Sequence, residues 1–224
     1  MRDEMTALHG ISWRYDRHEI IADGIVHGVG VVAALIAVTV LIFYATVWGT
    51  GGSLASAWIY GIGLVASLGI SFAYNIWPVS PVKLALRRLD HSAIFILIAA
   101  TYTPFLEAGL PDPIVLANLI GIWAVALFGA FLKCVWPGRF DRLAILLYLT
   151  MGWSGVLLWS RLHDVLSLAT MILILIGGFI YSLGVIFHVW EKLRFQSAIW
   201  HGFVVAAAGV HYAAVLLCVV GSQT

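Results

Sequence analysis

Charged side chains are scarce in this sequence. Asp, Glu, Lys and Arg make up 10% of its 224 residues, whereas hydrophobic residues make up 62%. None of the four charged types occurs between Gly24 and Val82, a stretch long enough for two membrane spans. So few charged residues exclude an ordinary water-soluble domain and predict an integral membrane protein.

Other features that the sequence lacks narrow the class further. The chain has only two cysteines, Cys134 and Cys218, which we expect on opposite membrane faces, so no disulfide is predicted. We expect no secretory signal, because the first residues are polar and of mixed charge. Short segments of alternating polarity are also missing, which excludes a transmembrane β-barrel.

Seven continuous apolar runs are present, each long enough to cross a bilayer as a helix. Residues 1–23 precede them and are expected to form a cytoplasmic interfacial segment, and residues 24–224 are expected to form the membrane domain. The predicted fold is therefore an all-α integral membrane protein, a seven-transmembrane helix bundle. The expected spans are residues 25–48, 54–76, 90–109, 114–133, 142–160, 165–188 and 198–220.

Basic residues are distributed unevenly between the two sides of these spans. Eleven of the twelve Lys and Arg residues fall in the amino-terminal segment or in the alternate loops, and Arg161 alone falls on the other side. Cytoplasmic loops carry the excess of positive charge, so we expect the N-terminus in the cytoplasm and the C-terminus outside. The Arg87-Arg88 pair is interpreted as part of this anchor, which could also attract anionic lipid headgroups.

Polar residues gather near the predicted cytoplasmic ends of the spans. Three spans carry two of them spaced four apart, which places each pair on one helix face. The pairs are Asp23 with His27, Ser71 with Asn75, and Ser197 with His201. Asp90 stands at the entrance of the third span, where a carboxylate is costly without a partner. The sequence therefore predicts one polar pocket, built around Asp90 and opening to the cytoplasm.

Two further polar residues lie deeper in the spans. His211 follows His201 by ten residues, which places it about 15 Å deeper and rotates it roughly 80° away from the same face. We therefore expect His211 to bond to a neighbouring span rather than to share a ligand with His201. Tyr102 is expected to contribute only to packing.

These motifs resemble the hemolysin III proteins, the bacterial branch of the progestin and adipoQ receptor group, which also resembles alkaline ceramidases. The matching stretches are Asp90-His-Ser-Ala-Ile, Ala100-Thr-Tyr-Thr-Pro-Phe105, Glu19 to Gly30, Ile199-Trp-His201 and Ala206 to His211. The resemblance implies a multi-pass protein of the bacterial inner (cell) membrane. Its expected partners are membrane lipids, with a lipid as ligand or substrate and no nucleic acid. The oligomeric state is left open.

The resemblance also implies a zinc ion in the cytoplasmic third of the bundle. In that family, one histidine of the second span and two of the seventh hold the metal, and the aspartate that matches Asp90 contacts it through water. Here Asn75 and Ser197 stand at two of the three histidine positions, and His201 keeps the third. Asparagine and neutral serine are poor zinc ligands, so the expected zinc site is incomplete.

The sequence leaves three interpretations of this polar layer open. In one, a metal-free pocket that hydrogen-bonds its ligand serves binding or sensing. In another, His201 and Asp90 hold zinc with His27 or Asp23 as a substitute ligand, and Asp90 and Ser71 serve catalysis as zinc-activated water hydrolyses a lipid amide or ester. In the third, the layer is structural and Asp90 caps its helix. The family name also suggests a cytolytic activity. A conducting path would need polar residues through the whole bilayer, and the outer halves of these spans are apolar.

Overall fold

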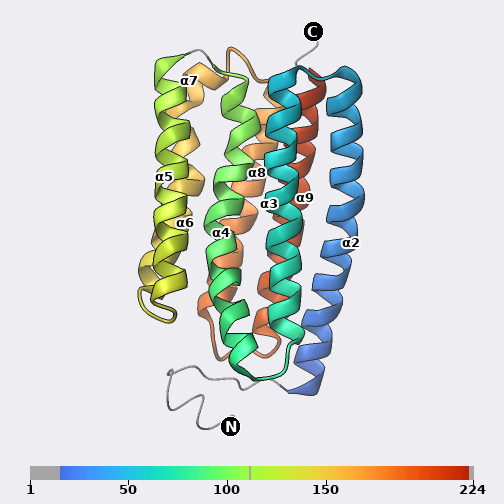
Figure 1. The fold of residues 1–224 in the computed structure, drawn as a ribbon, viewed down its shortest axis with the longest axis vertical. Coiled ribbons are helices and arrows are strands. Elements are labelled where there is room, and N and C mark those ends of the chain that lie inside the picture. The colour runs from blue at the N-terminus through green and yellow to red at the C-terminus, as the bar shows by residue number, and fades with distance from the viewer. Residues whose placement is uncertain (1–15, 111, 222–224) are drawn as a thin grey trace.

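The chain, seen as a computed structural model, is described for residues 16–110 and 112–221. All regular secondary structure of these residues is helical, and seven segments are long and apolar enough to cross a membrane. They stand side by side along one axis (Figure 1). The predicted all-helical bundle with seven spans is therefore confirmed. The predicted interfacial segment lies largely outside the described residues, because these begin at Asp16.

Six spans are single helices, and the fifth is composite. The segments are α2 (Arg17–Trp48), α3 (Gly51–Ile76), α4 (Pro81–Glu107), α5 (Pro113–Val135), α6 (Asp141–Trp153) with η1 (Ser154–Leu158) and α7 (Trp159–Leu162), α8 (Leu168–Val189) and α9 (Gln196–Gly221). Because each connection is short, successive spans run in opposite directions.

Two helices begin well before the spans predicted for them. The α2 helix starts after Asp16, which forms a reciprocal capping box with Glu19. The α4 helix starts after Ser80, whose side chain accepts a hydrogen bond from the Lys83 N–H at 3.3 Å. Asp90 therefore lies well inside α4, and the interpretation that it caps this helix is wrong.

The first and last spans lie side by side. The α2 helix packs against both α3 and α9, α3 packs against α4, α4 packs against α5, and α9 packs against α8. The α6 helix packs less extensively and reaches α4 and α8 over short stretches. Figure 1 shows α5 and α6 at the opposite side of the bundle from α2.

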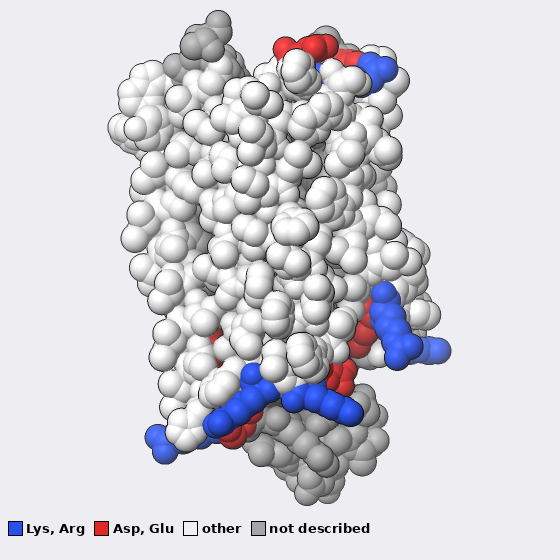
Figure 2. All heavy atoms as spheres, turned by 180° about the vertical axis from the view of Figure 1, so that it is seen from behind, with Lys and Arg blue, Asp and Glu red and all other residues white. Residues whose placement is uncertain are grey.

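Charged side chains lie at the two ends of the bundle, and an apolar belt separates them (Figure 2). Among the described residues, every Lys and Arg except Arg161 lies at the end where α2, α4, α6 and α9 begin. At the other end Arg161 forms an ion pair with Asp112. Hydrogen bonds from the Ile114 backbone N–H, together with Arg161, lower the pKa of Asp112 below its ordinary value. The belt carries exposed apolar side chains such as Leu157, as expected of a surface that faces lipid.

The fifth span is broken near its middle by the 3-10 segment η1. The Tyr102 hydroxyl, from α4, donates to the Gly152 carbonyl at 2.7 Å and accepts from the Gly155 N–H at 2.9 Å. It thereby satisfies two backbone groups that the break would leave unpaired. The Trp153 indole N–H lies 3.0 Å from the Ser182 hydroxyl of α8 and ties the break to a second helix. The expectation that Tyr102 only packs is therefore wrong.

Candidate functional site

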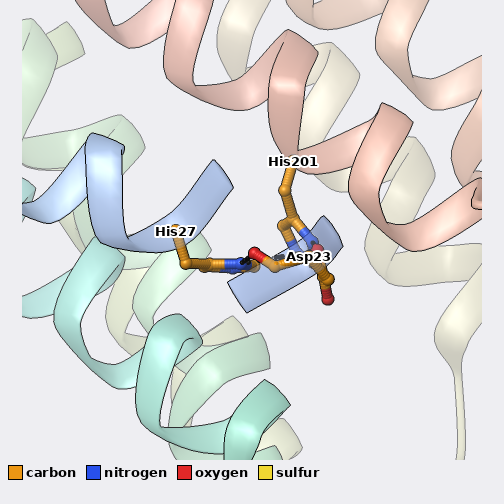
Figure 3. A group of neighbouring side chains, drawn as sticks. All are labelled: Asp23, His27 and His201. Carbon is orange, nitrogen blue, oxygen red and sulfur yellow. Dashed lines mark hydrogen bonds and ion pairs between the residues drawn. The ribbon is translucent and has the colours of Figure 1, made fainter. Parts of the chain in front are cut away.

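Asp23, on α2, is the centre of a buried hydrogen-bond network. One carboxylate oxygen lies 2.8 Å from Nδ1 of His201, and the other accepts from the Ser197 hydroxyl at 2.9 Å. Both partners are on α9. The Asp23 side chain is only 7% exposed, so its carboxylate depends on these two contacts rather than on water for its hydrogen bonds. Figure 3 shows the Asp23 carboxylate between the rings of His27 and His201.

His27 continues the network from α2 to α3. Its Nδ1 lies 2.8 Å from the Asp23 backbone carbonyl, which can only accept, so Nδ1 carries the proton. Its Nε2 lies 3.0 Å from the Ser71 hydroxyl and 3.4 Å from the amide nitrogen of Asn75. The amide of Asn75 is oriented by its donation to the Ser71 carbonyl at 2.9 Å. The Asn75 amide nitrogen can only donate, so Nε2 of His27 accepts in that contact, whereas the Ser71 hydroxyl can donate or accept.

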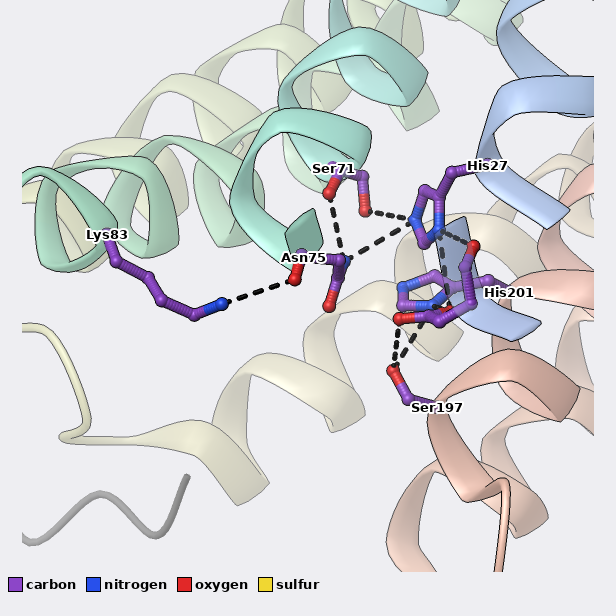
Figure 4. A network of polar contacts seen from close by, with 7 residues as sticks. His27, Ser71, Asn75, Lys83, Ser197 and His201 are labelled. Atoms are coloured by element: carbon purple, nitrogen blue, oxygen red, sulfur yellow. Dashed lines mark hydrogen bonds and ion pairs between the residues drawn. The ribbon is translucent and has the colours of Figure 1, made fainter. Parts of the chain in front are cut away.

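The network joins the inner ends of three helices (Figure 4). Asp23 and His27 come from α2, Ser71 and Asn75 from α3, and Ser197 and His201 from α9. Lys83 lies at its edge and donates to the Asn75 carbonyl at 3.3 Å and to the Trp77 carbonyl at 2.8 Å. The spacing of four residues thus places each predicted pair on a face that turns into the bundle.

Asp90 occupies the margin of this network rather than its centre. Its carboxylate lies near the Ser71 hydroxyl and close enough to both His27 and His201 for electrostatic interaction. The hydrogen bonds converge instead on Asp23, which the sequence placed among the lining residues. The signal for Asp23 was present in the sequence: it is the last acid before the charge-free run that begins at Gly24, and it stands one turn before a histidine.

A large cavity adjoins the network. Its volume is about 970 Å³, and it runs along the bundle between α4, α6, α8 and α9. Its inner end is lined by the polar side chains of His27, Ser71, Asn75, Asp90 and His201. Most of its length is apolar, with Leu97, Ile98, Leu149, Ile174 and Val204 on its wall. Nε2 of His201 has no hydrogen-bond partner among the described residues, which leaves it available to a bound molecule.

His211 lies along the same cavity, far from the network. Its Nε2 lies 3.1 Å from the Ile174 carbonyl of α8. Gly177 stands directly against its ring and leaves no room for a side chain there. The expectation that His211 bonds to a neighbouring span is confirmed.

Asp23, His27 and His201 form a group that could hold a metal ion. One donor atom from each lies within 4.8 Å of the other two. Two imidazoles and one carboxylate are a donor set that zinc accepts in catalytic sites. Zinc would hold its ligand atoms about 3.3 Å apart, given bonds of about 2.0–2.1 Å in tetrahedral geometry. His27 Nδ1 lies 3.4 Å from the Asp23 carboxylate, close to this value, but it would have to give up its proton and its hydrogen bond to the Asp23 carbonyl before it could bind zinc. His201 Nδ1 lies 2.8 Å from the same carboxylate, which is a hydrogen-bond distance.

Comparison with known sequences places the chain in a family. Residues 15–212 match the family described as "Haemolysin-III related". The chain belongs to the haemolysin-III family. Among its relatives, the "Hemolysin-3 homolog" of Bacillus subtilis (strain 168) is 36% identical over 198 residues, which cover 88% of this chain and 93% of the relative. The "Hemolysin-3" of Bacillus cereus is 36% identical over 201 residues, 90% of this chain and 92% of the relative.

The haemolysin-III sequence pattern extends to animals. The "Monocyte to macrophage differentiation factor" of Homo sapiens is 34% identical over 168 residues, which cover 71% of this chain and 68% of the human protein. These relatives and the seven apolar helices make this haemolysin-III family member a multi-pass membrane protein. The predicted family is therefore confirmed.

Proposed function

We propose that this haemolysin-III family member binds an amphipathic lipid in the cavity beside the Asp23 network, as a binding or sensing protein that needs no metal. The single observation that carries this proposal is the division of the cavity wall. Its inner end gathers most of the polar side chains, and its remaining length is mainly apolar, with Thr101, Ser182 and His211 as polar exceptions. A molecule with a polar head and an apolar tail is complementary to both parts.

The hydrogen bonds of the network support a metal-free pocket. Asp23 uses both carboxylate oxygens, and His27 uses both ring nitrogens, within the protein. A polar network in which most groups are satisfied is rigid, and it can present fixed donors and acceptors to a ligand. His201 Nε2 and the Asp90 carboxyl are the groups that we expect to contact the head of the lipid.

The position of the charges supports an orientation in the membrane. Basic side chains gather at the end of the bundle where α2 begins, which is also the polar end of the cavity (Figure 2). By the positive-inside rule this end faces the cytoplasm, and the C-terminus lies outside. In a bacterial cell the bilayer concerned is the inner membrane. The lipid would then place its head near the inner leaflet.

A zinc-dependent hydrolase is the second candidate, because the donor atoms of Asp23, His27 and His201 lie so close together. Zinc, when bound, would supply Lewis-acid activation of a water molecule. Asp23, His27 and His201 are the residues that would hold it. Asp90 and Ser71 would orient water and a lipid amide or ester carbonyl at the adjoining cavity wall.

The experiment is to fill the cavity and measure lipid retention. Leu149→Trp adds volume to a side chain on the cavity wall, whereas Leu157→Trp adds the same volume to a side chain that is 83% exposed on the lipid-facing surface. We expect protein purified in a mild detergent to retain a lipid, detected by native mass spectrometry. Leu149→Trp should lower its occupancy at least about tenfold, because overpacking a site costs about 1–3 kcal/mol.

Leu157→Trp serves as the matched control and should leave the occupancy unchanged. Equal retention by both variants would place the lipid on the outer surface of the bundle and contradict the proposal. Loss of the lipid from both would indicate a general defect in folding, which the thermal unfolding curve of each variant would reveal.

A further inference from the structure

Lys133 is a buried cation on the mainly apolar helix α5. Its side chain, on α5, is only 5% exposed. Its ammonium forms an ion pair with the Asp141 carboxylate and donates to the Arg139 carbonyl at 3.3 Å. A buried charge is costly unless it is fully compensated, so its surroundings determine what else can bind there.

Arg87 shares the same carboxylate. Its side chain, on α4, is 11% exposed, and its Nη2 lies 3.5 Å from the second oxygen of Asp141. Among the described residues, no other carboxylate lies within 4.0 Å of either cation, and Asp90, one turn further along α4, is beyond that distance from Arg87. Asp141 itself is 43% exposed and only partly desolvated. Two well-buried cations therefore depend on one half-exposed anion.

The turn between α5 and α6 builds this arrangement. Gly138 and Phe140 both adopt left-handed backbone conformations, with φ values of 79° and 62°. The chain thereby reverses within a few residues and returns Asp141 to the end of α5. A side chain at Gly138 would begin 3.7 Å from the Arg87 guanidinium, so the glycine keeps this side of the cation uncovered.

Both cations line the large cavity at its inner end, across from the Asp23 network. Arg142, the second residue of α6, lines the same end and is exposed. Arg142 has no carboxylate within ion-pair distance among the described residues. The mouth of the cavity therefore has a cationic wall built from α4, α5 and α6, and a hydrogen-bonding wall built from α2, α3 and α9.

We propose that Lys133, Arg87 and Arg142 bind the phosphate of a lipid headgroup at the mouth of this cavity. This inference rests on the proposed function and names the class of its ligand: a phosphate-bearing lipid with net negative charge. Asp141 supplies one negative charge to two buried cations, and a phosphate would supply a second. It would bind through charge-assisted hydrogen bonds to the guanidinium and ammonium groups. The acyl chains would follow the apolar part of the cavity.

The test is native mass spectrometry of the full-length protein in an uncharged detergent, with three lipids that carry identical dioleoyl chains. Phosphatidylglycerol is anionic, phosphatidylcholine is zwitterionic, and dioleoylglycerol has no phosphate. We expect phosphatidylglycerol to be retained at least about tenfold more than dioleoylglycerol, because one charge-assisted hydrogen bond suffices for such a ratio. Phosphatidylcholine should fall between them.

Two variants act in opposite directions. Lys133→Met keeps the length of the side chain and removes its charge, so the preference for phosphatidylglycerol should fall about tenfold. Asp141→Asn removes the competing carboxylate and should raise the preference. Arg161→Gln removes a cation at the opposite end of the bundle and should change nothing. Because the ratio of lipids is measured within one sample, a partly unfolded variant still gives a result.

The outcomes separate this inference from the proposed function. Equal retention of the three lipids would overturn the phosphate site and leave the lipid cavity in place. Retention of none would overturn both. If Lys133→Met and Asp141→Asn lower only the unfolding temperature, the ion pair is structural and the inference fails. If inorganic phosphate displaces phosphatidylglycerol while dioleoylglycerol stays bound, the site belongs to a free phosphate and the lipid assignment is overturned.

Discussion

Asp23 holds its place through two hydrogen bonds to one neighbouring helix, and this makes it the residue on which the site depends most. Asp23→Asn keeps the shape of the side chain but turns one acceptor into a donor that faces either Ser197 or His201. We expect a loss of about 1–3 kcal/mol in stability, the cost of leaving a buried polar group unpaired. Thermal unfolding in detergent measures it.

Asp164 provides the control for this substitution. Its side chain is 82% exposed, so Asp164→Asn should change stability by no more than about 0.5 kcal/mol. The zinc content of the same purified samples tests the alternative function. Stoichiometric zinc in the unmodified protein that disappears in His201→Ala would contradict the metal-free pocket.

At this scale the sequence indicates which side chains share a helix face, but not the acid on which their hydrogen bonds converge. The four-residue spacing of Asp23 and His27 correctly indicated one inward face. Which acid would form the most hydrogen bonds depended on the rotation of α2 against α9, and a single sequence carries no measure of that rotation. The sequence favours Asp90 as the centre because a carboxylate at the entrance of the third span needs a partner, yet its carboxylate lies near Ser71 at the edge of the network.

The fifth span shows how one side chain can shape a whole element. Tyr102→Phe should leave the Gly152 carbonyl and the Gly155 N–H without their partner, at a cost of about 1–3 kcal/mol for each group. We therefore expect faster amide hydrogen exchange in η1 and a lower unfolding temperature. Hydrogen exchange read by mass spectrometry would locate the effect to residues 152–158.

Tyr44 provides the matched control for this prediction. Its hydroxyl has no hydrogen bond among the described residues, so Tyr44→Phe should leave exchange in η1 unchanged. If Tyr102→Phe leaves exchange in η1 equally slow, the two hydrogen bonds do not hold the break in place.

The existence and order of the spans were predictable, because each is a long apolar run and their separations contain glycine, proline or charge. The break in the fifth span was not. Tyr102, fifty residues earlier in the chain, forms hydrogen bonds to the backbone on both sides of the break, and this long-range contact cannot be read from the local sequence, where Gly152 and Gly155 permit a break without requiring one. The extension of α4 ahead of Asp90 was not predictable from hydropathy either, because Ser80 and Pro81 begin the helix outside the apolar run.

As a whole, the molecule has an apolar belt between its two charged ends and a cavity whose far end is mainly apolar. The wall there includes Phe105, Leu162 and Met171, and a conducting path would need polar groups at this depth. We therefore expect no release of a small dye from liposomes that contain the purified protein. Dye release well above that from liposomes without protein would contradict this and favour the cytolytic function that the relatives' names suggest.

The link from Asp23 to the last helix also bears on how the protein is made. Asp23 enters the bilayer with the first helix, whereas Ser197 lies 174 residues later in the chain. Until α9 is synthesised, the carboxylate has neither of its α9 partners and is costly to keep in hydrocarbon. Assembly of the bundle should therefore finish only when the final segment is inserted, and ribosomes stalled before it should leave a product that membrane proteases remove.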